Sequence, residues 1–482
     1  CKPSLSVLFS FMVSLDSAIG SPLTFDEVKR LVDKTSSSIE LKLDTGLDNG
    51  SCSKGRYLVA KRSIARGEVL LSEFPLFCGR TDGAHSKKIC VEEFVALSEE
   101  EETGDDVEDD DSLHPCSPLV DCLSAILITK SQALNSKDKT ECARAKLKLR
   151  QLAALHRTNV NMQFLSESVQ EVLDVFRPEF RGLLTENEAQ DIIRAISSNR
   201  FSGMENQLDL MFAGSMFEHS CRPNCFAANW RRATSQPRLY RALHDIQAGD
   251  ALSISYIQLP ELYCPTVERA DLLSGWGFTC ACPRCTQLPE LTRSFICPAC
   301  SEPELCPPRP GCDVHELCCL SCGHSAEHDY VTRCFQLEDI LKRMLEGDAS
   351  ESLEGASQTK GDNDIISCFH HAAFRVAYGK MEEGLADLVG RVLPTADAIE
   401  DVIRCITRLH SSETHPHLLE LYHTMAELTC KDLVEQQHYL RLEHAVLSSS
   451  YPDESQRQDD EIFHMVTRRG PMEKGAPHAW NM

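Results

Sequence analysis

The sequence lacks long apolar runs and is poor in positive charge. It contains no stretch of about 18 or more apolar residues, so we predict no membrane-spanning helix. Lys and Arg number 49 against 73 Asp and Glu, which gives a formal net charge of -24. Proteins that bind the nucleic-acid backbone need clustered positive charge, so we expect no direct binding of DNA or RNA. An acidic surface instead favours basic partners, such as lysine-rich peptides.

Cysteine, by contrast, is abundant, with 24 among 482 residues. Disulfides in an oxidising compartment and thiolate–metal sites in a reducing one would both explain this number. Disulfide frameworks usually stabilise small chains, whereas a chain of this length buries a large core without them. At about 150 residues per domain, the length predicts two or three domains. Because 42% of the residues are apolar and 25% are charged, the composition is that of a globular protein.

The first residues carry two weak signals. Residues 4–15, preceded by Lys2, resemble the apolar core of a signal peptide, but the resemblance is slight and we do not expect secretion. The chain starts with Cys1 rather than Met, so we expect a fragment or a processed form.

The rest of the chain alternates between strand-like, acidic and helical segments. Apolar runs at 57–60 and 69–71 flank a turn and predict a pair of β-strands. Residues 99–111 hold ten acidic residues in thirteen, which predicts a disordered loop. Helical spacing marks 141–196 and again about 365–449, where paired antiparallel helices fit the pattern. The second helical region carries apolar residues at Leu385, Leu388, Val389, Val392, Leu418, Leu419, Tyr422, Met425 and Leu428.

A first cysteine motif is Cys280-Ala-Cys282-Pro-Arg-Cys285. Three thiolates this close cannot all pair with one another as disulfides, but they can occupy three corners of a zinc tetrahedron. The fourth ligand would then come from elsewhere in the chain. Buried or redox-active cysteines are the alternative interpretation.

A second motif consists of two Cys-x-x-Cys pairs, Cys297/Cys300 and Cys319/Cys322, separated by eighteen residues. This spacing is typical of a zinc ribbon. Other potential ligands lie nearby, at Cys306, Cys312, Cys318 and His324. Residues 280–328 have a net charge of -3, from three Arg and six acidic residues, so we expect the ribbon to be structural rather than to read nucleic acid. With little apolar periodicity in this segment, metal is expected to supply its core.

A third motif runs from Ser215 to Cys225 and is followed by a strand, an Ala-Gly-Asp turn and a second strand that ends at Tyr256. Short strands and turns are predicted throughout 212–257, with Leu252, Ile254 and Tyr256 alternating onto one face. Taken alone, a tyrosine at the end of a strand is usually a packing residue, and His219 would more often be a structural histidine.

Together these motifs resemble the SET domain of protein lysine methyltransferases, and particularly the SMYD family. The residues that carry the resemblance are His219-Ser220-Cys221, Pro223-Asn224, Gly249-Asp250, Tyr256 and Phe278-Thr-Cys280-Ala-Cys282-Pro-Arg-Cys285. Residues 55–60 look like the first cofactor-binding strand of that family. The resemblance covers about 50–286 and extends more weakly to the helical C-terminal part, where His415-Pro416-His417 precedes a helix.

The resemblance implies an α+β fold, a SET-type β-fold with a helical insertion, a post-SET zinc site, a zinc-ribbon-like segment and an α-helical C-terminal domain. It implies that Cys221 is the fourth zinc ligand beside Cys280, Cys282 and Cys285. S-adenosylmethionine would contact Lys54, Gly55, Arg56, Tyr57, Ser215, Glu218, His219 and Phe278. Tyr256 would be the catalytic residue, orienting the methyl group and the amine, while His219 would shape the pocket. The ribbon cysteines would hold a second structural Zn²⁺.

The sequence departs from the family pattern in two places. Position 218 is Glu where the family usually has Asn, and a carboxylate can accept hydrogen bonds but not donate them. The MYND zinc finger is also not complete: Cys78, Cys90, His114, Cys116 and Cys122 lack paired spacing. The opening tripeptide Cys1-Lys2-Pro3 is either the end of a truncated upstream finger or a chance match.

We therefore expect a protein-lysine N-methyltransferase, acting on histone or non-histone lysine in the nucleus and cytoplasm. The alternative is a weak or inactive SET-fold interaction protein, such as a transcriptional co-regulator. The predicted parts are an N-terminal segment 1–48, a SET domain 49–279 with the acidic loop and helical insertion, a post-SET and ribbon-like segment 280–328, and a helical domain 329–482 with a linker at 346–363 and a polar tail.

Overall fold

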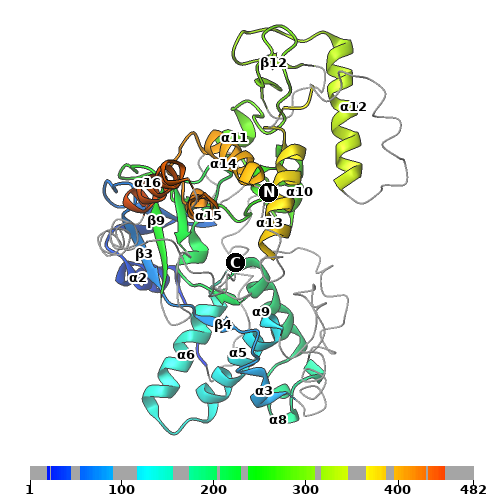
Figure 1. Cartoon of the computed structure of the whole chain (residues 1–482). Coiled ribbons are helices and arrows are strands. Elements are labelled where there is room, and N and C mark those ends of the chain that lie inside the picture. The colour runs from blue at the N-terminus through cyan, green and yellow to red at the C-terminus, as the bar shows by residue number, and fades with distance from the viewer. Residues whose placement is uncertain are drawn as a thin grey trace, which may run out of the picture.

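The computed structural model combines short β-sheets with helices, as expected for an α+β protein (Figure 1). It describes residues 19–21, 23–44, 55–90, 117–155, 173–202, 207–228, 237–309, 316–345, 365–367, 369–386, 396–429 and 432–450. The acidic loop 99–111, the linker 346–363, the polar tail and Cys1-Lys2-Pro3 lie outside these residues. The predicted domain boundaries stay predictions.

The first sheet pairs β1 (Ile39–Asp44) antiparallel with β2 (Gly55–Ala60). Helix α2 (Phe25–Thr35) precedes it and begins with a capping box, in which Thr24 and Glu27 satisfy each other's backbone N–H groups. Val28 and Val32 turn the apolar face of α2 into the core. Strand β2, the expected cofactor strand, is therefore supported on one edge by β1.

A second sheet has the order β3 (Val69–Glu73), β9 (Arg238–Ala242) and β8 (Cys225–Ala228), all antiparallel. The two strands predicted around 57–60 and 69–71 both exist, but they do not pair with each other. The turn between them instead bonds to β9, because the N–H of Gly67 donates to the carbonyl of Ala242 at 2.8 Å. The chain thus leaves the first sheet at this turn and enters the second.

The helical insertion packs on a third sheet, formed by β4 (Phe77–Gly79), β6 (Leu208–Leu210) and β5 (Arg200–Ser202). Its helices are α3 (Ser86–Ile89), α5 (Pro118–Asn135), α6 (Lys139–Ala153), α8 (Pro178–Arg181) and α9 (Glu186–Asn199). The prediction that helices begin at 141 missed α5. Helix α5 is buried on almost every side, so its sequence has no polar face to reveal the helical period.

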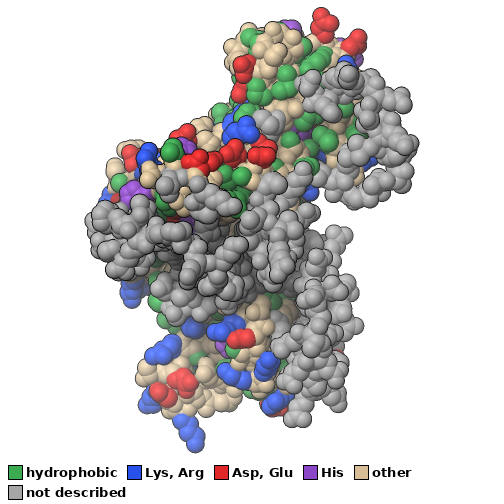
Figure 2. Space-filling model, in the orientation of Figure 1, with side chains coloured by type: hydrophobic (Ala, Val, Ile, Leu, Met, Phe, Trp, Pro, Cys, Tyr) green, Lys and Arg blue, Asp and Glu red, His purple; other side chains and the backbone are tan. Residues whose placement is uncertain are grey.

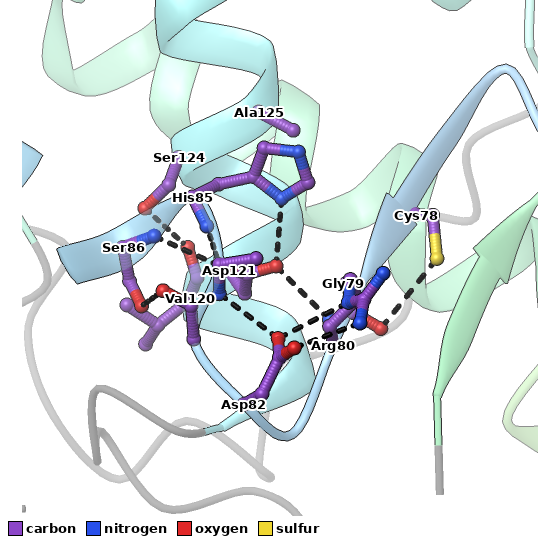
Figure 3. A network of polar contacts seen from close by, with 12 residues as sticks. Cys78, Gly79, Arg80, Asp82, His85, Ser86, Val120, Asp121, Ser124 and Ala125 are labelled. Carbon is purple, nitrogen blue, oxygen red and sulfur yellow. Dashed lines mark hydrogen bonds and ion pairs between the residues drawn. The ribbon is translucent and has the colours of Figure 1, made fainter. Parts of the chain in front are cut away.

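The loop from β4 to α3 is held against α5 by Asp121, which is fully buried (Figure 3). The carboxylate of Asp121 accepts the N–H groups of Arg80, His85 and Ser86 at 3.0, 2.6 and 2.8 Å, and the His85 ring at 2.8 Å. Gly79 is required beside this loop, because a Cβ there would lie 1.7 Å from the carbonyl oxygen of Pro118. The sheet and the insertion are therefore joined by close backbone contact.

The segment that carries the third motif forms a short parallel pair. Strand β7 (Glu218–His219) follows the turn η2 (Gly214–Met216) and pairs parallel with β10 (Ser253–Ile254), with His219 opposite Ile254. Leu252 and Ile254 are buried and Tyr256 packs against the same core, so the predicted alternation is confirmed. Two stretches more than thirty residues apart thus lie side by side.

The cysteine-rich segment contains α11 (Pro283–Thr286), β11 (Leu305–Cys306) and β12 (Cys318–Cys319), and it follows η3 (Glu261–Tyr263) and α10 (Thr266–Ser274). It also has a small apolar core, in which Phe295, Leu305 and Leu317 meet Val331 of α12 (His328–Leu345) and Ile365. The expectation that metal alone would provide its core was therefore incomplete. The apolar partners come from residues after the segment, which its own sequence cannot reveal.

The C-terminal part is helical, with α13 (His371–Ala386), α14 (Ala396–His410), η6 (Pro416–Leu418), α15 (Leu419–Leu428) and α16 (Leu433–Ser450). Leu418, Tyr422 and Met425 are buried in one apolar cluster, in line with the predicted periodicity. Leu388, Val389 and Val392 lie outside the described residues. Within the described part of the chain, no helix has the length and apolar character needed to cross a bilayer.

Candidate active site and metal centres

The structure brings Cys221 to the trio Cys280, Cys282 and Cys285, as the resemblance implied. The four sulfur atoms lie within 4.8 Å of one another. Cys221 Sγ is 4.0 Å from Cys280 Sγ and 3.6 Å from Cys285 Sγ. Cys221 lies two residues after β7 and Cys285 lies in α11, so this cluster joins segments that are 59 to 64 residues apart.

These sulfur spacings fit a zinc tetrahedron. A Zn–S bond of about 2.3 Å places the sulfurs of a tetrahedral site about 3.8 Å apart. A disulfide would require about 2.05 Å between the sulfurs, and every cysteine in the described residues is free of disulfides. Four cysteine thiolates are also a donor set that Zn²⁺ takes in structural sites. The residues present therefore fit the metal.

The second predicted cluster is also assembled. Cys297 Sγ lies 3.8 Å from Cys322 Sγ, and Cys300 Sγ lies 3.6 Å from Cys319 Sγ. All four sulfurs again lie within 4.8 Å of one another. Of the rival ligands, Cys306 and Cys318 lie outside this group, and so does His324. Cys312 is outside the described residues.

Two buried arginines surround the first cluster, and sequence reasoning did not single out either. Arg269 is fully buried and donates to Cys221 Sγ at 3.3 Å and to Cys285 Sγ at 3.4 Å. Arg284 donates to the carbonyl oxygen of Leu262 at 2.7 Å. Nothing in the local sequence marks these arginines as buried, because charged residues are normally found at the surface.

His219 lies between the cysteine cluster and Tyr256. Its Nδ1 accepts the backbone N–H of Tyr256 at 3.0 Å, and its Nε2 is 3.3 Å from Cys221 Sγ. Because a backbone N–H can only donate, Nδ1 is unprotonated and the ring proton sits on Nε2, facing the sulfur. Burial lowers the pKa of His219 to about 4, so the ring is neutral near pH 7. This arrangement agrees with a structural role for His219 rather than that of a general base.

The hydroxyl of Tyr256 donates to the carbonyl oxygen of Phe217 at 2.6 Å. Burial, together with the charge of Glu218, raises the pKa of Tyr256, so the phenol stays protonated. Aromatic rings surround it: the centroid of Trp276 is 5.9 Å away and that of Phe278 is 6.1 Å away, edge-on. A protonated hydroxyl in an aromatic setting can orient a polar group, and water is largely excluded from such a setting.

The expected cofactor residues fall into two groups. His219 and Phe278 are together, with their rings 5.8 Å apart. Strand β2 contacts η2, so the strand of Gly55 and Tyr57 reaches the turn that holds Ser215. Gly55 has φ +71° with open space on its side-chain face, a backbone that leaves room for a bound molecule.

The other expected cofactor contacts are less direct. Lys54 is outside the described residues. The guanidinium of Arg56 donates to the carbonyl of Ala154, just after α6. The side chain of Arg56 is therefore already bonded, and its backbone in β2 is the part left for a cofactor. Ser215 donates its hydroxyl to the carbonyl of Phe212 at 2.9 Å. Asn199, at the end of α9, donates its side-chain amide to the carbonyl of Ala195 within its own helix.

A buried group of possible ligands outside this site is Glu338, His370 and His371. The Glu338 carboxylate accepts Arg293 Nε at 2.9 Å and lies 2.8 Å from His371 Nε2. Since the carboxylate is already occupied by a guanidinium, this group is an ion-pair network that ties α12 to α13.

The His415-Pro416-His417 motif belongs to a second histidine group. The rings of His410 and His415 are stacked, with centroids 3.5 Å apart and planes 6° from parallel. His415 Nδ1 accepts the backbone N–H of His417 at 3.3 Å. Burial lowers the pKa of both stacked rings well below the usual value, so they pack as neutral imidazoles at the start of η6.

Comparison with known proteins finds a match to a SET domain over part of this chain. Residues 55–257 match the family model of the SET domain. A SET and MYND domain-containing protein of Dictyostelium discoideum is 40% identical over 74 residues, 15% of this chain and 17% of that protein. The potential protein lysine methyltransferase SET6 of Saccharomyces cerevisiae is 39% identical over 72 residues, 15% of this chain and 18% of that protein.

Solved structures of SET domains give only a loose match. The crystal structure of the SET domain of LSMT bound to lysine and AdoHcy is 13% identical, with a TM-score of 0.32, over 92% of this chain and 100% of that one. The segment 55–257 is thus similar to a SET domain, and the matches span less than a fifth of the length of the curated relatives.

Proposed function

We propose that this SET-domain chain is an S-adenosylmethionine-dependent protein-lysine N-methyltransferase of SMYD type. The observation that carries the proposal is the meeting of Cys221 with Cys280, Cys282 and Cys285. The ring of Phe278 lies 5.8 Å from that of His219 and 6.1 Å from that of Tyr256, which supports the proposal. The names of the two curated relatives, a SET and MYND protein and a potential lysine methyltransferase, support the same assignment.

In the proposed reaction the lysine ε-amine, in its neutral form, attacks the methyl carbon of the sulfonium, and the C–S bond breaks as the N–C bond forms. The extra proton on the product amine then passes to solvent. Tyr256 would orient the amine and the methyl group through its protonated hydroxyl, whose present partner is the Phe217 carbonyl. Phe278 and Trp276 would exclude water from the reacting atoms.

Two structural zinc sites are part of the proposal. Cys221, Cys280, Cys282 and Cys285 would hold one ion, and Cys297, Cys300, Cys319 and Cys322 the other. Bound zinc would supply a fixed cross-link between chain segments, with no open position for chemistry. The first site would anchor the backbone just after His219, because Cys221 follows it by two residues, and tie it to residues 280–285.

A second candidate function is favoured by Glu218. This carboxylate stands where the family pattern has an amide, one residue before His219 in β7. Glu218 can accept hydrogen bonds from the ammonium group of the methyl donor, but its negative charge would repel the donor's carboxylate. If that repulsion dominates, the SET fold would act as a docking platform without methyl transfer.

Calorimetric titration of zinc-loaded protein with S-adenosylmethionine separates these functions. We expect one binding site, and we expect Glu218→Asn to bind about tenfold tighter, because one like-charge contact is removed. If S-adenosylmethionine gives a heat of binding with Glu218→Asn but none with the wild type, the result favours the docking platform. Methylation of a lysine peptide array, with histone and non-histone sequences side by side, then tests the activity itself. The nucleus and cytoplasm remain the predicted locations.

A further inference from the structure

Arg269 of α10 is a buried charge that the proposed reaction leaves unused. A guanidinium is seldom fully buried unless it is paired. Its first partners are two sulfurs of the first cysteine cluster, at 3.3 Å to Cys221 and 3.4 Å to Cys285. Another partner is the carboxylate of Glu290, because Nη1 of Arg269 lies 3.7 Å from Oε1 of Glu290. Arg269 thus lies between a set of thiols and a buried carboxylate.

The carboxylate partner is itself held in place. Glu290 is buried and accepts the backbone N–H of Thr266 at 2.8 Å and the hydroxyl of Thr292 at 3.1 Å. Arg269 also donates to the hydroxyl of Thr266 at 2.9 Å. Because each group is bonded on more than one side, the guanidinium has little freedom to turn away from the sulfurs.

Cys221 connects Arg269 to the candidate catalytic residue Tyr256 through His219. Its sulfur receives Arg269 Nε from one direction and His219 Nε2 from the other, both at 3.3 Å. His219 Nδ1 in turn accepts the N–H of Tyr256. Arg269, the sulfur, His219 and Tyr256 therefore form one continuous run of polar contacts.

We propose that Arg269 is a positioning residue for the methyl-transfer centre, acting through the thiolates of Cys221 and Cys285. This inference rests on the proposed zinc site. Four thiolates around one Zn²⁺ leave two negative charges, and a buried guanidinium offsets one of them where water cannot. Its charged hydrogen bonds also fix the sulfur that orients His219, and they make the thiolates less reactive toward electrophiles.

The test compares Arg269→Gln and Arg269→Lys with the wild type in two measurements. With Co²⁺ in place of zinc, the sulfur-to-metal charge-transfer band should move to lower energy in Arg269→Gln, because a thiolate that loses a hydrogen-bond donor holds its electrons less tightly.

Zinc release during alkylation with N-ethylmaleimide should show two phases, one for each cluster. One phase should become about tenfold faster in Arg269→Gln, the effect of losing one charged hydrogen bond. Arg269→Lys, which keeps the charge, should lie between.

Arg284→Gln is the matched control, because Arg284 is also buried beside the cluster but donates to the backbone carbonyls of Leu262, Cys264 and Cys221 and not to a sulfur. It should lower stability without moving the cobalt band. Wild-type protein that binds no zinc would overturn the metal site and leave nothing for Arg269 to position. Two bound zinc ions with the same band and release rates in all forms would overturn the role of Arg269 alone. Should Arg269→Gln not fold, Arg269→Lys decides by the same two readouts.

Discussion

At the scale of single residues, the hydroxyl of Tyr256 has two possible partners. It donates to the Phe217 carbonyl at 2.6 Å, and in the proposed reaction it would turn to the methyl group and the amine. Its raised pKa keeps the proton in place for either bond. If the proposed function holds, the tyrosine contributes to both stability and catalysis, and the two contributions differ in size.

Tyr256→Phe should lower methyl transfer to a lysine peptide by about 100-fold, since a preorganised donor aimed at reacting atoms has an effect of this order. The free energy of unfolding should fall by only about 1 kcal/mol, for one lost hydrogen bond. Tyr263→Phe is the control, because the Tyr263 hydroxyl also donates to a backbone carbonyl, that of Phe369 at 3.1 Å. Equal turnover in the two variants would remove Tyr256 from the mechanism.

At the scale of elements, the clamp between the β4–α3 loop and helix α5 depends on one carboxylate (Figure 3). Burial by itself would raise the pKa of Asp121, but hydrogen bonds from His85 and from the backbone of Ser86 and His85 outweigh it and leave that pKa lowered. A carboxyl whose folded-state pKa is depressed contributes stability above its unfolded pKa, and that contribution is lost as the pH falls toward the folded value.

Asp121→Asn should therefore lower the free energy of unfolding at pH 7 by about 2–3 kcal/mol, because an amide cannot accept on both sides as the carboxylate does. Urea denaturation at pH 7 and below about pH 4 should show a smaller acid-dependent loss in this variant than in the wild type. The neighbouring Asp82 provides the control, since its side chain is 54% exposed and pairs with Arg80 at the surface. Asp82→Asn should cost less than about 1 kcal/mol. Matching denaturation midpoints for the two variants would contradict the clamp.

At the scale of the whole molecule, the two cysteine clusters connect parts that the chain order separates. The first joins Cys221, just after β7, to Cys285 of α11. The second lies next to the apolar contacts between the cysteine-rich segment and α12. Figure 1 shows β12 of the cysteine-rich segment and α12 at one end of the molecule, and α5 and α6 at the other. In Figure 2 basic side chains gather at the α5–α6 end, away from the cysteine-rich end. Metal binding is thus expected to organise one side of the molecule only.

Cys221→Ser tests this connection. Native mass spectrometry should count two zinc ions in the wild type and one in the variant, because a hydroxyl replaces one of four thiolates. Hydrogen exchange should rise in β7 and β10 and stay unchanged in α5 and α6. Cys264→Ser, which changes a buried thiol outside both clusters, should keep two zinc ions. One zinc ion in the wild type, or two in Cys221→Ser, would be the contrary result.

Much of this arrangement was readable in the sequence, because its signals are local. Cys-x-x-Cys pairs bring sulfurs together over a single turn, and the alternation of Leu252, Ile254 and Tyr256 follows from the two-residue period of a strand. The family motif added the expectation that Cys221 joins the trio, and the structure places it there.

Other features only the tertiary structure decided. Helix α5 carries no polar face, so its sequence does not mark it as a helix, and the partners of the strands at 57–60 and 69–71 depend on the sheets that form elsewhere. Arg269 and Glu290 look like surface residues in the sequence, yet both are buried against each other. The physical reason is the same in each case: burial and pairing are set by segments distant in the chain, whereas a spacing pattern reports only on its own neighbours.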